Sequence, residues 1–238
     1  MKSMNKTKSF EFKQFKIDGG YSGMPVSTDG VLLGAWMDLT ECASLLDVGT
    51  GTGLLSLMCA QRKPTLSIEA IDIEKNAIAA ANFNFLSSPW SDRITLHYND
   101  VLKHQFAHKF DAIICNPPYF NSGEQAANSA RALARHTDSL NHTHLLERCW
   151  SLLTPKGCAS FVLPIVEGEQ FIAIALSLGW SVKRCCSIKP TANKPVSRLL
   201  FELSKQSVAT QYQNLTIHQA TGYSSEFIDL TKDFYLKM

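Results

Sequence analysis

Leu45-Leu46-Asp47-Val48-Gly49-Thr50-Gly51-Thr52-Gly53 is the stretch of this chain that decides its fold. An apolar run typical of a buried strand leads into three glycines at alternate positions, and a helical pattern of apolar residues begins at Leu54. Glycine permits a tight turn and lets the backbone approach a ligand closely at the N-terminus of a helix. The stretch therefore predicts a strand, a ligand-binding loop and a helix in succession.

An acidic residue, Asp72, stands nineteen residues beyond Gly53, at the end of a second strand-like run, 67–71. A carboxylate in this place can accept hydrogen bonds from both hydroxyls of a ribose, although Glu74 is close enough to compete for that role. A dinucleotide-binding fold is the rival interpretation, but its fingerprint requires a glycine at the position of Leu54. The missing glycine argues against a dinucleotide as the ligand.

A second motif, Asn116-Pro117-Pro118-Tyr119, follows the apolar run 110–115. The run is typical of a buried strand, which the two prolines end. The side-chain oxygen of Asn116 and the carbonyl of Pro117 can accept hydrogen bonds, and Tyr119 offers a flat face for stacking. These groups suit an amino group on a flat ring or a side-chain amide. An ordinary turn at the end of a strand is the alternative.

Together, these motifs resemble class I S-adenosylmethionine-dependent methyltransferases that modify amino groups. The shared order is Asp47, the glycines, Asp72, Asp100 and then Asn116–Tyr119. Within that class, the segment Thr28–Trp36 is similar to the helix that precedes the glycine motif in bacterial methyltransferases of adenine in valine tRNA. Three further stretches are similar to the same methyltransferases: Phe12-Lys13-Gln14-Phe15, Ser88-Pro89-Trp90 and Phe234-Tyr235-Leu236. The resemblance extends from about Phe12 to the end of the chain.

Strand-like and helix-like runs alternate along the chain, which indicates an α/β fold with a parallel sheet covered on both faces. The resemblance implies a Rossmann-like class I methyltransferase fold: a seven-stranded, mostly parallel sheet with an antiparallel last strand, the last two strands pairing at the edge. We expect a single domain, 1–238, with an N-terminal extension and pre-motif helix in 1–43 and a core in 44–238. The expected strands are 44–48, 67–71, 94–98, 110–115, 158–164, 181–188 and 198–204, followed by 216–220. The expected helices are 54–63, 75–87, 138–153, 167–178 and 227–236.

The resemblance also implies S-adenosylmethionine as the cofactor, bound beyond the carboxyl ends of the strands. Gly49, Gly51 and Gly53 are expected to line its methionine part, with Asp47 orienting the loop or contacting the amino group. Asp72 is expected to hold the ribose. The remaining cofactor contacts are Thr28 and Asp29 at the methionine end, Asp100 at the adenine amino group, Val101 beside the adenine ring, and Asn116. For Asp100, a role in shaping the loop is the alternative.

The implied reaction is methylation of the exocyclic N6 amino group of an unpaired adenine in tRNA, the adenine 3′ of the anticodon in valine tRNA. Asn116 and Pro117 would accept the N–H groups of a poorly nucleophilic ring amine, and Tyr119 would stack on the base. Methylation of a protein glutamine, of a guanine in ribosomal RNA or of adenine in DNA are alternatives. A cofactor-binding module without catalysis is another.

Composition sets broader bounds. The chain has 238 residues, 45% of them hydrophobic, which is enough for one substantial core. It lacks an apolar run long enough to span a membrane, and its seven cysteines show no C-x-x-C pairing, so we expect a cytoplasmic protein with reduced thiols. His136, His142 and His144 have no carboxylate or cysteine at ligand spacing, so no metal is expected. The oligomeric state stays open, with a monomer as the expectation.

The net charge is only +2, but basic residues cluster in two places. One is the N-terminus and the other is the stretch 183–205. Within the second, we expect Lys189, Lys194 and Arg198 to contact the phosphate backbone of tRNA, because the segment 189–195 looks irregular and able to project. A solvated surface is the alternative for either cluster.

Overall fold

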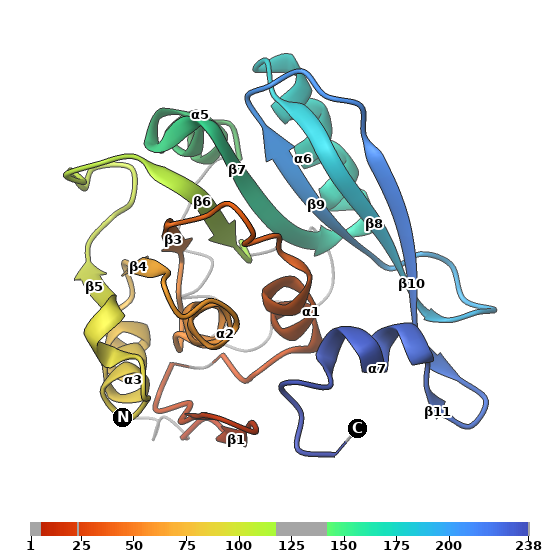
Figure 1. Ribbon diagram of the computed structural model, residues 1–238, viewed down its shortest axis with the longest axis horizontal. Coiled ribbons are helices and arrows are strands. Elements are labelled where there is room, and N and C mark those ends of the chain that lie inside the picture. The colour runs from red at the N-terminus through yellow and green to blue at the C-terminus, as the bar shows by residue number, and fades with distance from the viewer. Residues whose placement is uncertain (1–5, 23, 118–141, 238) are drawn as a thin grey trace, which may run out of the picture.

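A nine-stranded sheet forms the centre of the computed structural model, which describes residues 6–22, 24–117 and 142–237 (Figure 1). Its strands run in the order β11-β10-β8-β9-β7-β6-β3-β4-β5. Their bounds are β3 Ser44–Val48, β4 Ser67–Asp72, β5 Ile94–Tyr98, β6 Phe110–Cys115, β7 Leu153–Pro164, β8 Ser181–Thr191, β9 Arg198–Ser204, β10 Gln211–Gln219 and β11 Gly222–Tyr223.

Parallel pairing joins β5, β4, β3, β6 and β7, which confirms the Rossmann-like α/β fold. The strand β9 is antiparallel and lies between β7 and β8. The expectation that β8 and β9 form the edge of the sheet was wrong, because β10 pairs with β8 and β11 with β10. Of this extension only 216–220 was expected as a strand, because β10 is mostly polar and exposed and is anchored through buried Leu215.

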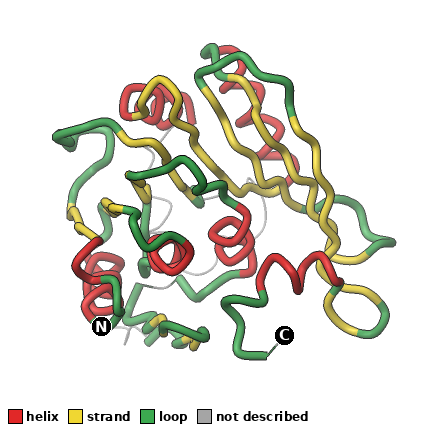
Figure 2. Tube along the Cα trace, in the orientation of Figure 1, coloured by secondary structure: helices red, strands yellow, loops and turns green. Residues whose placement is uncertain are grey.

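Helices cover both faces of the sheet (Figures 1 and 2). One face carries α1, α2, α3 and α7, and the other carries α5 and α6. A 3₁₀ turn, η1, precedes β5. The bounds are α1 Thr28–Trp36, α2 Leu54–Arg62, α3 Lys75–Leu86, η1 Ser91–Arg93, α5 His142–Leu152, α6 Ile165–Ser177 and α7 Ser225–Thr231.

Several expected boundaries differ from the structure, and two of the differences concern the end of β8 and the last helix. The strand β8 continues to Thr191, so Lys189 is part of the sheet, paired in register with Thr216 of β10. The irregular segment is 192–197, and the expectation of a loop from Lys189 onward was wrong. The last helix, α7, covers 225–231 and not the expected 227–236. It begins earlier because the Ser224 hydroxyl accepts a hydrogen bond from the N–H of Phe227 and caps it.

The N-terminal segment packs against the C-terminal end of the chain. A short hairpin of β1 Phe10–Glu11 and β2 Lys16–Ile17 leads into it, and Phe12 forms an antiparallel bridge with Tyr235. The Phe15 ring stacks on Phe12 at 4.6 Å and meets Trp90 edge-on at 5.9 Å between centroids. Three stretches that carried the family resemblance thus meet in one aromatic cluster, where they close the fold.

No helix in the described ranges is long and apolar enough to cross a membrane.

Candidate functional site

The glycine loop lies at the carboxyl end of β3, and its three glycines have φ of 68°, 57° and 84° at Gly49, Gly51 and Gly53. A Cβ added at Gly49 would meet no heavy atom of the described residues within 4 Å. At Gly51 it would approach the Met24 Cε to 2.8 Å, and at Gly53 the Phe85 Cε1 to 2.4 Å. Gly49 therefore presents open backbone to a ligand, whereas Gly53 allows α2 and α3 to pack closely.

Asp47 is fully buried beneath this loop. Its Oδ2 accepts hydrogen bonds from the Thr50 hydroxyl at 2.6 Å, from the Ser56 hydroxyl at 2.6 Å and from the Ser56 N–H at 3.1 Å. Burial raises the pKa of the Asp47 carboxyl to about 6, although these hydrogen bonds oppose the shift. Of its two expected roles, this geometry favours holding the loop and the start of α2 in place.

Asp72 lies at the end of β4 and also supports the loop. Its Oδ2 accepts from the Gly51 N–H at 2.8 Å and its Oδ1 from the Glu74 N–H at 2.9 Å. Burial raises the pKa of the Asp72 carboxyl, and these backbone N–H groups partly counteract it. The Glu74 side chain caps α3 by accepting from the Ala77 N–H at 2.7 Å. Because Glu74 serves the helix, Asp72 is the better candidate for the ribose.

Strand register brings the two sequence motifs together. Val48 is in register with Ile71 on one side and with Cys115 on the other. Gly49 therefore lies between Asp72 and Asn116 at one edge of the sheet. Asn116 is half-buried and Pro117 is buried. Pro118 and Tyr119 lie outside the described residues, so the expected stacking platform stays a prediction.

Asp100 and Val101 follow β5 at the same edge. The Asp100 Oδ1 accepts from the Leu102 N–H at 2.9 Å, and its Oδ2 lies 3.5 Å from the Lys103 Nζ. These contacts fit the loop-shaping alternative, and they leave the contact with an adenine amino group a prediction. Val101 is buried in the same apolar cluster as Val48 and Cys115, beneath the proposed site.

The start of α1 faces this edge as well. Ser27 caps the helix by accepting from the Gly30 N–H at 3.2 Å, Thr28 is exposed and Asp29 lies in the first turn. The Asp29 Oδ2 forms an ion pair with the Arg198 Nε at 2.8 Å. Asp29 was expected to contact the cofactor and Arg198 the RNA. The structure joins them across 169 positions of sequence, a contact that no local pattern could predict.

Sequence reasoning missed two residues that shape the site. The Met24 side chain covers Gly51, because its Cε lies 2.8 Å from the position that a Cβ on Gly51 would take. Asn84 is buried in α3, where its amide donates to the Thr52 carbonyl at 2.8 Å and to the Asp18 carbonyl at 3.0 Å. It thereby fixes the N-terminal segment to the glycine loop. A polar side chain on the apolar face of a helix was the available signal for Asn84.

The expected RNA contacts lie in the last part of β8, in the connection 192–197 and at the first residue of β9. Lys189 is half-buried in β8, and Lys194 is exposed in the segment 192–197, which extends past the sheet in Figure 1.

Of the three histidines considered as metal ligands, His142 and His144 lie in α5, and His136 lies outside the described residues. Within the described ranges, no group of three or more His, Cys, Asp or Glu residues could hold a metal ion.

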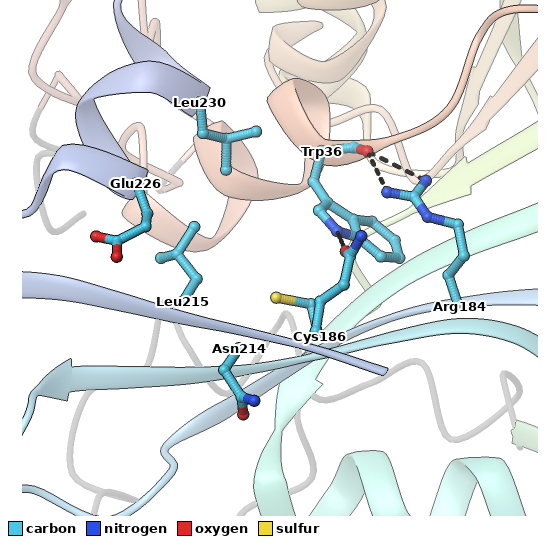
Figure 3. A pocket seen from close by; sticks show the side chains of 8 residues that line it. Trp36, Arg184, Cys186, Asn214, Leu215, Glu226 and Leu230 are labelled. Carbon is cyan, nitrogen blue, oxygen red and sulfur yellow. Dashed lines mark hydrogen bonds between the residues drawn. The ribbon is translucent and has the colours of Figure 1, made fainter. Parts of the chain in front are cut away.

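A separate hollow of about 470 Å³ lies between α1, α7, β8 and β10 (Figure 3). The Arg184 guanidinium carbon lies 4.1 Å from the centroid of the Trp36 ring, and the Trp36 indole N–H donates to the Gln213 Oε1 at 2.8 Å. None of the expected cofactor residues lines it. Trp36 bonds to both Gln213 and Arg184 across it, so we interpret it as a packing seam between α1 and the sheet.

Comparison with known proteins adds independent evidence. Residues 18–143 match the family model described as methyltransferase small domain. A protein of Vibrio campbellii named tRNA1(Val) (adenine(37)-N6)-methyltransferase is 61% identical over 98% of this chain and 97% of its own length. A protein of Aliivibrio fischeri with the same name is 53% identical over 98% of this chain and 99% of its own.

Solved structures agree on the fold. A protein of Agrobacterium tumefaciens described as a predicted O-methyltransferase aligns with a TM-score of 0.65 at 18% identity, over 87% of this chain and 96% of its own. A ribosomal protein L11 methylase of Lactobacillus delbrueckii aligns with a TM-score of 0.52 at 18% identity, over 75% and 77% of the two chains. At this identity the likeness concerns the fold alone.

Proposed function

Because the chain belongs to the family of the tRNA1(Val) (adenine(37)-N6)-methyltransferases, we propose that it methylates the N6 amino group of the adenine 3′ of the anticodon in valine tRNA. It is an S-adenosylmethionine-dependent methyltransferase. We assign this activity to the carboxyl edge of the sheet because Gly49 lies there between Asp72 and Asn116.

The residues at this edge fit S-adenosylmethionine. Gly49 presents open backbone where a side chain would otherwise stand, and Asp72 lies beside it as an acceptor for ribose hydroxyls. Thr28 and Asp29 at the start of α1 would contact the methionine end, and Asp100 and Val101 the adenine. Gly51 and Gly53 complete the loop, which Asp47 holds from beneath.

When bound, the cofactor supplies a methyl group on a sulfonium, which is transferred by in-line displacement. The task of the chain is therefore to place and activate the attacking amine. Its lone pair is delocalised into the adenine ring. If the Asn116 side-chain oxygen and the Pro117 carbonyl accept its two N–H groups, the nitrogen becomes pyramidal and more nucleophilic. Such bonds strengthen towards the transition state, as catalysis requires.

A base inside a helix cannot reach Asn116, so the target must be unpaired or turned outward. An anticodon loop presents such bases at little cost. From the sequence motif, we propose that Tyr119 stacks on the target adenine. We further propose that Lys189 and Lys194 contact phosphates of the anticodon arm, since both lie at the carboxyl edge that also carries Gly49 and Asn116.

We also propose a location, a domain organisation and an oligomeric state for the protein. A tRNA substrate and reduced cysteines suit the cytoplasm. The packing of the N-terminal segment against Tyr235 supports one domain over residues 1–238, with 1–43 as an extension that closes the core 44–238. We also propose that the protein acts as a monomer.

The test is incubation of the purified protein with S-adenosylmethionine labelled in its methyl group and separate pools of tRNA, ribosomal RNA, DNA and protein. We expect label in tRNA alone. Label in a protein glutamine, in a ribosomal guanine or in DNA would replace the proposed substrate by that alternative. Binding of the cofactor without transfer to any pool would favour a module without catalysis.

A further inference from the structure

We propose that Arg198 is a positioning residue for the cofactor site, which it serves through Asp29, and that it is not a phosphate contact. The inference rests on the proposed function for the identity of the cofactor. Its starting point is the ion pair between the Arg198 Nε and the Asp29 Oδ2 at 2.8 Å. The two side chains are 34% and 17% exposed, so the pair is partly shielded from water.

Arg198 is well placed for this role because its backbone is fixed on both sides. It is the first residue of β9, in register with Pro164 of β7 and with Ile188 of β8. The adjacent Ser197 donates its N–H to the Ile188 carbonyl at 2.9 Å and accepts from the Ile165 N–H at 3.2 Å. The guanidinium therefore extends from a rigid point at the centre of the carboxyl edge.

The guanidinium is committed to protein groups at two of its nitrogens. Besides the Nε bond to Asp29, its Nη1 donates to the Ser197 carbonyl at 2.8 Å. Charge-assisted bonds of this kind are short and directional. They orient the Asp29 carboxylate within the first turn of α1, where a negative charge is also favoured by the helix dipole. The pair thus sets the position of the helix start that we assign to the methionine end of the cofactor.

The alternative for Arg198 is the phosphate contact expected from its place in a basic stretch. Lys194 offers a contrast in the loop just before β9, because it is exposed and lies only four positions earlier. A phosphate contact releases counterions, so its loss lowers the slope of log affinity for tRNA against log salt by about one unit. A positioning residue instead changes cofactor affinity and leaves that slope unaltered. The two roles are therefore separable by measurement.

The experiment compares Arg198→Gln, Arg198→Lys, Asp29→Asn, the double variant Arg198→Gln/Asp29→Asn and Lys194→Gln. Calorimetry measures the dissociation constant of S-adenosylhomocysteine, and tRNA binding is followed across a salt series. For Arg198→Gln we expect roughly three- to tenfold weaker cofactor binding, the scale of a partly shielded ion pair, with an unchanged salt slope. Arg198→Lys should retain part of the affinity, and the double variant should bind no more weakly than Asp29→Asn.

Lys194→Gln should do the reverse, with a lower salt slope and unchanged cofactor affinity. If Arg198→Gln binds the cofactor as the wild type does and loses a unit of slope, Arg198 is a phosphate contact and the inference is overturned. Additive losses in the double variant would also overturn it, because Arg198 would then act independently of Asp29. If Arg198→Gln does not fold, the Arg198→Lys and Asp29→Asn pair still tests the link. Failure of the wild type to bind S-adenosylhomocysteine would refute the proposed function itself.

Discussion

Asp47 illustrates how one buried acid can tie a binding loop to its fold. Its folded pKa is about 6 against a usual value of 3.8, because burial disfavours the charged form. Folding therefore favours the protonated acid. The associated stability is fully present below pH 3.8 and is lost as the pH rises through about 6. A shift of this size corresponds to about 3 kcal/mol.

We accordingly predict that the free energy of unfolding of the wild type falls, relative to Asp47→Asn, between pH 4 and pH 6 and then levels off. Urea denaturation of both proteins from pH 4 to pH 8 measures this difference. The variant serves as the control, because all other titrating groups are common to both proteins. Two curves that run parallel across the range would show that the Asp47 carboxyl titrates normally in the folded state.

Asn116 should affect turnover far more than cofactor binding, since it is proposed mainly to hold the amine of the target. Loss of such an acceptor costs on the order of a hundredfold in turnover, and we predict this for Asn116→Ala at saturating cofactor and tRNA. Asp72→Ala is the matched comparison and should mainly weaken cofactor binding. Single-turnover methylation and calorimetry separate the two effects. Near wild-type turnover in Asn116→Ala would exclude the role in orienting the amine.

At the level of single residues, the sequence predicted best what lies close together along the chain. Asp47, the glycines and Asp72 belong to one strand–loop–helix–strand unit, and their arrangement follows from glycine geometry and strand register. The pairing of Asp29 with Arg198 depends on how α1 packs against β9, and Met24 reaches Gly51 from a segment without regular structure. Long-range contacts of this kind are not encoded in any local pattern.

Among the elements, β6 was predicted with its observed bounds because an apolar run ends at two prolines, both strong local signals. The end of β8 and the first half of β10 were harder to predict, because within β10 only the residues from 216 onward were expected as a strand. Lys189 and Pro190 resemble a loop in sequence, and only pairing with β10 keeps them in the sheet. Polar edge strands carry little hydrophobic periodicity, so their pairing is decided by the fold and not by the sequence of the strand.

The end of β8 and the segment 192–197 together form the element that we assign to the tRNA backbone. We predict that Lys189→Ala/Lys194→Ala weakens tRNA binding and lowers the salt slope by about two units, one for each phosphate contact. Turnover at saturating tRNA should persist. Lys109→Ala/Lys156→Ala is the matched control, because these exposed lysines lie before β6 and in the first part of β7, at the opposite edge. An unchanged slope in the first variant would direct attention to the N-terminal lysines.

For the molecule as a whole, the aromatic cluster of Phe12, Phe15, Trp90 and Tyr235 joins segments from both ends of the chain to the helical face that carries α1, α2 and α3. The three stretches of the family resemblance that contain these aromatic residues therefore have a structural role, because they pack the two ends of the chain onto the fold. The proposed site lies elsewhere, at the edge of the sheet where β3, β4 and β6 end and β9 begins. The resemblance predicted the fold and the activity together, but it was the register of the strands that placed Gly49 beside Asn116.

The most direct test of the central claim is to map the methyl group on the RNA. Unmodified valine tRNA is incubated with the protein and S-adenosylmethionine, digested, and analysed by mass spectrometry, alongside a transcript with guanine in place of the adenine 3′ of the anticodon. The account predicts one methyl group, recovered as N6-methyladenosine, in the fragment that contains this adenine, and none in the substituted transcript. A methyl group on any other nucleotide, or equal methylation of both transcripts, would contradict it.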